Sequence, residues 1–158
     1  MRRLAFAIAL AGVLLNLLLE YWLMDATARM AIIPGVADFY PAWNRGVSFS
    51  LFTQDSETGR YMLMAVLGAI SAGVAWMAWG ATDGLSALGY GLILGGALGN
   101  LYDRAVHGAV FDFLYLHLGA MPLFICNFAD ILISAGVLVL LLEWLRAKPL
   151  STSGLSRP

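Results

Sequence analysis

The 158-residue chain is 61% hydrophobic and only 12% charged, with a formal net charge of −1. A soluble domain carries about 25% charged residues, so this composition excludes a water-soluble globular protein and predicts an integral membrane protein. The near-zero charge gives no support to nucleic-acid binding. The length suits a single domain over residues 1–158. The one cysteine, Cys126, excludes an intrachain disulfide and lies among apolar neighbours that indicate a packing role.

Apolar runs long enough to cross the hydrocarbon core predict four spans, at about residues 4–24, 61–81, 85–102 and 124–144. The first run follows a basic start, as in a signal peptide, but continues through Trp22 without a clear small-x-small cleavage site. We therefore predict an uncleaved span. It contains Glu20, which either faces protein or water inside the bundle or reaches the membrane surface.

The segments between the spans differ in character. Residues 25–60 are rich in charge and contain prolines, which predicts an extramembrane excursion, and residues 47–51 alternate apolar and polar side chains, as a short half-buried strand does. Residues 105–123 contain Pro122 and several glycines, which argue against a regular helix and favour an extended or partly interfacial segment. Residues 146–158 are predicted to be a disordered tail.

The third span carries a row of small residues. Gly91, Gly95 and Gly99 recur at every fourth position and therefore share one helix face. Such rows let a second helix approach closely. The row continues to Asp103, beside Asn100, so the packing face leads toward a polar cluster.

The four spans place both termini on one side of the membrane. Basic residues flank the spans closely on that side: Arg2, Arg3, Arg146, Lys148 and Arg157. This arrangement favours cytoplasmic termini, with the polar cluster opening on the outer face.

The polar cluster stands between two hydrophobic runs and consists of Asn100, Asp103, Arg104, Asp112, Asn127 and Asp130. Ionisable groups at membrane depth are costly and usually functional. Helix caps and surface salt bridges are the alternative, and a pairing of Asp103 with Arg104 is the plainest case. Asn127, Asp130 and Ser134 are spaced i, i+3, i+7, which predicts a polar stripe on the fourth span.

Asp112 and Asp130 are the candidates for catalysis. Two carboxyl groups that face each other in a partly dry site cannot both ionise cheaply, so one keeps a proton. The ionised partner can then activate water, and the protonated partner can donate to the carbonyl oxygen and to the leaving amine of a peptide bond. Asn100, Arg104 and Asn127 can position the pair or the substrate by hydrogen bonds.

Other hydrolytic chemistries fit poorly. The chain has no HExxH element. His107, Asp112 and His117 are five residues apart and share no helical or strand face, so no metal site is predicted. Ser48 and Ser50 lack a nucleophile elbow.

Taken in order, these motifs resemble those of the lipoprotein signal peptidases (signal peptidase II), bacterial inner-membrane aspartic proteases that cut signal peptides from prolipoproteins. Residues 44–49 (NRGVSF) are similar to an Asn-x-Gly-x-x-Phe element, and residues 99–104 (GNLYDR) to a Gly-Asn-x-x-Asp-Arg element. Residues 110–113 (VFDF) and 124–131 (FICNFADI) resemble the segments that hold the two catalytic aspartates. The resemblance covers nearly the whole chain.

The resemblance implies an all-α membrane protein of four transmembrane helices, with a small extramembrane β-element on the periplasmic side that caps the site. It implies Asp112 and Asp130 as the catalytic dyad, with a polar surround of Asn44, Asn100, Arg104 and Asn127. Asp103 and Glu20 are then structural polar residues.

The resemblance also implies the setting of the reaction. The substrate is a prolipoprotein with a diacylglyceryl-modified cysteine just after the scissile bond. The enzyme is an inner-membrane monomer in contact with lipids, with cytoplasmic termini, a site toward the periplasmic face, and no metal or cofactor.

The first span departs from the family pattern, which usually has an aspartate followed four residues later by a lysine. Here these positions are Glu20 and Met24, so the acid is longer and its basic partner is missing. Two other readings stay open. One is a non-enzymatic four-span protein, such as a small transporter subunit, with polar residues along a pathway. The other is a second type of intramembrane aspartic protease, which fits Tyr102-Asp103 but lacks its Gly-x-Gly-Asp element.

Overall fold

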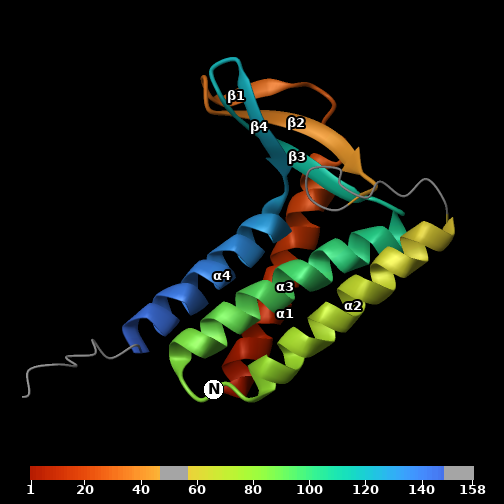
Figure 1. Cartoon of the computed structure of the whole chain (residues 1–158). Coiled ribbons are helices and arrows are strands. Elements are labelled where there is room, and N and C mark those ends of the chain that lie inside the picture. Colours follow the sequence, from red (N-terminus) through yellow and green to blue (C-terminus); the bar gives the residue numbers. More distant parts are fainter. Residues whose placement is uncertain (47–56, 148–158) are drawn as a thin grey trace, which may run out of the picture.

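The computed structural model describes residues 1–46 and 57–147, in which four helices form a bundle (Figure 1). In chain order they are α1 (Arg2–Leu23), α2 (Glu57–Trp79), α3 (Gly84–Val106) and α4 (Phe128–Ala147). Each has the length and apolar composition needed to cross a membrane. Large side chains such as Leu14, Trp76 and Leu138 are exposed, as expected for surfaces that contact lipid. The predicted four-helix membrane architecture is confirmed.

A four-stranded antiparallel sheet lies over one end of the bundle (Figure 1). Its strands, in spatial and chain order, are β1 (Met30–Ile33), β2 (Ala37–Asn44), β3 (Val110–Leu118) and β4 (Met121–Cys126). β1 and β2 come from the segment after the first span, so the expected small β-element is present. The strand predicted at residues 47–51 lies outside the described residues, as does the tail beyond residue 147.

Residues 105–123 contribute most of the β3–β4 hairpin, a regular structure where the sequence favoured only an extended or interfacial segment. Gly119 has a φ of +57° in the turn between the strands, a conformation that favours glycine. Pro122 lies in the edge strand β4, where its missing N–H costs least. Because β4 extends past residue 124, the fourth helix begins only at Phe128.

The central helix of the bundle is α3, which packs mainly against α1 and α4. The predicted glycine row faces α1, where a Cβ atom on Gly95 would lie 2.9 Å from the Ala9 carbonyl oxygen. A second glycine face, which the sequence did not reveal, meets α4, where a Cβ on Gly96 would lie 2.8 Å from Ile133 Cγ1. Both neighbours therefore pack closely on α3, and the start of α4 is held beside the C-terminal half of α3.

Aromatic side chains join the sheet to the bundle. Phe39 of β2 and Phe111 and Phe113 of β3 are buried together. They pack against residues at the end of α1 and the start of α4, including Leu19, Leu23 and Phe128. Burial of each such ring contributes roughly 1.5–3 kcal/mol. Since Asp112 stands between two of these anchored rings, the backbone that carries it is fixed relative to the helices.

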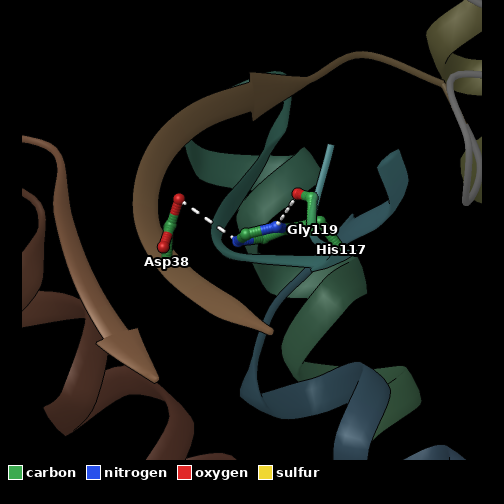
Figure 2. A network of polar contacts seen from close by, with 3 residues as sticks. All are labelled: Asp38, His117 and Gly119. Atoms are coloured by element: carbon green, nitrogen blue, oxygen red, sulfur yellow. Dashed lines mark hydrogen bonds and ion pairs between the residues drawn. The ribbon is translucent and has the colours of Figure 1, made fainter. Parts of the chain in front are cut away.

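A polar contact fastens β3 to β2 at the end of β3 near the β3–β4 turn (Figure 2). The His117 ring has Nδ1 2.8 Å from the Gly119 carbonyl oxygen and Nε2 3.4 Å from Asp38 Oδ2. The ring also stacks on Tyr115, with centroids 5.0 Å apart. The Gly119 carbonyl and then the Asp38 carboxylate raise the pKa of His117 above its usual value. His117 therefore serves to hold the sheet together.

Candidate active site

A cavity of about 200 Å³ lies where α2, α3 and α4 meet the sheet. Its polar wall is formed by Asn44, Asn100, Arg104, Asp112 and Asp130. Its apolar wall comes from the helices, with Leu67, Ile70, Val74, Ile93, Ala97 and Ile133. The structure thus brings both candidate carboxylates, Asp112 from β3 and Asp130 from the start of α4, to one concave site.

Asp112 is held by two amide side chains. It is 3% exposed and accepts hydrogen bonds from Asn44 Nδ2 at 2.9 Å and from Asn127 Nδ2 at 3.0 Å. Asn44 is in reach because β2 pairs with β3 with Asn44 opposite Val110. Burial, followed by the charge of Asp130, raises the pKa of Asp112 to about 6, against the lowering effect of the two amides and of Arg104. A carboxyl group with this pKa can gain or lose a proton near neutral pH.

Asp130 lies in the first turn of α4 and is half-buried. Its backbone N–H donates to Asn127 Oδ1 at 2.9 Å, and its Oδ2 accepts from the Asn127 N–H at 3.4 Å. This reciprocal pair is a capping box. Asn100 Nδ2 donates to Asp130 Oδ1 at 2.9 Å. The helix dipole is positive at this end of α4, so an acidic side chain there stabilises the start of the helix.

Asn127 connects the two carboxylates. It is fully buried, and its Nδ2 donates both to Asp112 and to Asn100 Oδ1, the latter at 2.9 Å. The predicted polar stripe on the fourth span is therefore wrong in part. Asn127 precedes the helix as its cap, and Ser134 is exposed rather than directed at the site.

Arg104 is bound by main-chain oxygens. Its Nη1 donates to the Asn100 carbonyl at 3.0 Å and its Nη2 to the Gly46 carbonyl at 2.6 Å. It thereby ties the end of β2 to α3, while its charge lies close enough to act on Asp112 and Asp130. The Gly46 N–H in turn donates to Asn44 Oδ1 at 2.9 Å. The rest of that motif, residues 47–49, lies outside the described residues.

Asp103 and Glu20 do not line this cavity. Asp103 is fully buried, and its Oδ2 accepts from the Phe111 N–H at 3.3 Å. Within the described part of the chain it forms no salt bridge with Arg104. The surface ion pair considered for these two residues is therefore not the arrangement that the fold adopts.

Two further residues lie near the carboxylates. Ser71 of α2 lines the cavity. Its hydroxyl donates to the Leu67 carbonyl at 2.8 Å, so the hydroxyl hydrogen is not available to a substrate. Cys126 is buried beside the site, and burial, followed by the charges of Asp130 and Asp112, raises the pKa of its thiol to about 11. A thiol with that pKa is neutral, which agrees with a packing role.

Comparisons with known proteins identify the family. The family profile described as signal peptidase (SPase) II matches residues 8–146. The chain belongs to the signal peptidase II family. The lipoprotein signal peptidase of Methylorubrum extorquens (strain PA1) is 49% identical over 118 residues, which cover 74% of this chain and 68% of that protein. That of Rhodopseudomonas palustris (strain TIE-1) is 35% identical over 156 residues, covering 93% and 94%.

Two solved structures, both bacterial membrane enzymes, share the fold. One, solved at 2.3 Å, has a TM-score of 0.78 at 18% identity and covers 97% of this chain and 94% of that chain. The other, at 1.9 Å, has a TM-score of 0.76 at 20% identity and covers 91% and 94%. At this identity the likeness shows the fold alone. Membership of the signal peptidase II family makes the chain a membrane peptidase and removes the transporter alternative.

Proposed function

We propose that this peptidase is an intramembrane aspartic endopeptidase that removes signal peptides from lipid-modified prolipoproteins, cutting just before the diacylglyceryl-modified cysteine. One observation carries the aspartic mechanism. Asp112 and Asp130 line the same cavity and hydrogen-bond to the same residue, Asn127. The relatives named lipoprotein signal peptidase support the choice of substrate.

The chemistry follows from the shared setting of the two carboxyl groups. Together Asp112 and Asp130 hold one proton, because two adjacent charges in a buried site repel. The ionised carboxylate takes a proton from water, and the oxygen of that water attacks the peptide carbonyl. The protonated carboxyl donates to the carbonyl oxygen, and the departing amine then takes up a proton. The reaction needs neither metal nor cofactor.

The surrounding residues keep the dyad in place. Asn44, Asn100 and Asn127 direct amide N–H groups at the two carboxylates. Arg104 adds positive charge without a direct bond to either carboxylate among the described contacts. The proposed enzyme acts as a monomer.

The shape of the cavity suits a peptide that enters from the membrane. Residues of α2, α3 and α4 give it an apolar wall on the bundle side, and the sheet borders its polar wall. An apolar signal peptide can contact the helix side, while the bond to be cut lies against the carboxylates. The lipid chains on the cysteine stay within the bilayer.

Cleavage by purified protein tests this proposal. Wild-type protein in lipid vesicles should convert a diacylglyceryl-modified prolipoprotein into a mature protein that begins with the modified cysteine, as measured by mass spectrometry. The same prolipoprotein without the lipid is the matched control and should be cut far more slowly. Cleavage at another bond, or equal cleavage of both substrates, would contradict the proposed specificity.

We also propose that the enzyme lies in the inner membrane with both termini in the cytoplasm and its site toward the periplasm. In Figure 1, α1 begins and α4 ends at the end of the bundle away from the sheet. That end carries Arg2, Arg3 and Arg146, the bias expected on the cytoplasmic side.

Topology reporters check this orientation. A reporter fused after residue 158 should show a cytoplasmic location. A reporter inserted at Gly35, in the β1–β2 turn, should show a periplasmic location. If both reporters show the same location, the proposed orientation is contradicted.

A further inference from the structure

A second pair of carboxyl groups lies outside the cavity, between α1 and α3. Glu20 is 3% exposed, Asp103 is fully buried, and their side chains face each other within hydrogen-bonding range where α1 packs on α3. Two carboxylates cannot form a hydrogen bond, because neither has a hydrogen to donate. A bond between the two side chains therefore requires a proton on one of them. The proposed catalytic dyad uses neither residue.

The hydrogen-bond partners indicate which one carries it. Asn16 Nδ2 donates to Glu20 Oε1 at 2.6 Å, which leaves the other Glu20 oxygen to hold a hydrogen. Asp103 Oδ2 accepts from the Phe111 N–H, whereas Asp103 Oδ1 is buried and receives no bond from any N–H or alcohol donor among the described residues. A protonated Glu20 supplies that missing donor.

The charges nearby do not replace this proton. Both Nη groups of Arg104 donate hydrogen bonds to main-chain oxygens. His107 interacts with Asp103 only through its charge, at a distance. Asp112 adds a further negative charge near Glu20. Met24, one turn after Glu20, brings no charge. Within the described residues, no cation forms a salt bridge with Glu20 or Asp103.

The pair is connected to the candidate dyad through one backbone bond. Asp103 accepts from the Phe111 N–H, and Phe111 directly precedes Asp112 in β3. We propose that Glu20 and Asp103 share one proton and that this acid pair holds Asp112 in position at the cavity. This inference rests on the proposed function. Glu20 acts through Asp103 and touches no reacting atom.

The conservative variant and the disruptive variant should behave differently. Glu20→Gln keeps an N–H donor to Asp103, so its kcat should stay close to wild type. Glu20→Leu leaves the Asp103 carboxylate buried without that donor and lets the start of β3 move. Misplacement of a catalytic group by about 1 Å can cost roughly 10²-fold, so kcat should fall to that extent while KM changes little.

A second measurement tests the contact between Asp103 and the Phe111 N–H independently of catalysis. Hydrogen exchange at the Phe111 amide should stay slow in wild type and in Glu20→Gln and become faster in Glu20→Leu. Tyr21→Leu is the matched control, since Tyr21 is the next residue on α1 and is 74% exposed. It should leave both kcat and exchange unchanged.

Two outcomes would overturn the inference. If Glu20→Gln loses activity and protection as Glu20→Leu does, both acids are ionised and no proton is shared. If Glu20→Leu keeps wild-type kcat and slow exchange, the pair positions nothing. Failure of the wild-type protein to cut its substrate would count against the proposed function instead, while the exchange measurements would still decide on the acid pair.

Discussion

Replacing Asp112 or Asp130 with Asn should nearly abolish cleavage of lipid-modified prolipoprotein. Asparagine keeps the size and part of the hydrogen bonding but cannot take and give the proton that the reaction moves. General acid–base catalysis contributes about 10²–10⁴-fold, so kcat should fall at least to that extent. Cleavage by purified variants is the measurement, and the amount of each variant in the membrane is measured alongside.

The double variant tests whether the two carboxylates act as one unit. Groups that act together show strongly non-additive losses, so Asp112→Asn combined with Asp130→Asn should cost little more than either change alone. Asp103→Asn is the comparison, because an amide there can still accept from Phe111 and donate to an ionised Glu20. It should retain measurable turnover. Substantial activity in either dyad variant would rule out the aspartic mechanism.

The dyad also predicts a dependence on pH. Burial raises the pKa of Asp112 to about 6 in the free enzyme. Its protonated form is present below that pH and is lost above it. If the dyad needs this proton, kcat/KM, which reports the free enzyme, should decline as the pH rises through this range. A value of kcat/KM that stays constant from about pH 5 to about pH 8 would contradict this assignment.

Adding one methyl group at Gly96 should damage both stability and catalysis. A Cβ there would lie 2.8 Å from Ile133 Cγ1 and 3.2 Å from the Ala129 carbonyl carbon, so α4 must move away from α3. Overpacking of this kind costs about 1–3 kcal/mol. The movement would separate Asn100 from Asp130, which are joined across the same two helices at 2.9 Å. Thermal unfolding and kcat of Gly96→Ala measure the two effects.

Gly68→Ala is the matched control for this change. Gly68 lies in the middle of α2 with nothing within 4 Å of an added Cβ. Both substitutions gain about 1 kcal/mol of helix propensity, so only the contact with α4 distinguishes them. Equal unfolding temperatures and equal kcat values for the two variants would show that the α3–α4 contact tolerates a side chain.

The sequence predicted the helices well because the bilayer imposes a strict length and composition on each span. The β3–β4 hairpin was not predicted as strands. Its first strand, Val110–Leu118, is apolar almost throughout instead of alternating, because it is buried over most of its length. A short apolar run of that kind cannot be assigned to strand or helix by its period alone.

Within the site, the sequence identified the polar residues but not their partners. Asp112 and Asp130 were expected to converge, and they do. From the sequence, Asp103 was considered as the ion-pair partner of Arg104, its neighbour in the chain. In the fold, its side chain instead contacts that of Glu20 from α1. Asn127 was placed inside a helix that in fact starts after it. Contacts between distant segments depend on helix rotation and strand register, which local spacing does not encode.

The order of the elements has a consequence for how the enzyme is made. Asn44 is translated before α2, Asp112 after α3, and Asn127 and Asp130 only as α4 begins. Until the last helix has entered the bilayer, a nascent chain lacks one proposed catalytic carboxylate and the amide that holds the other. On the proposed mechanism, the chain therefore gains proteolytic competence only after α4 has been inserted.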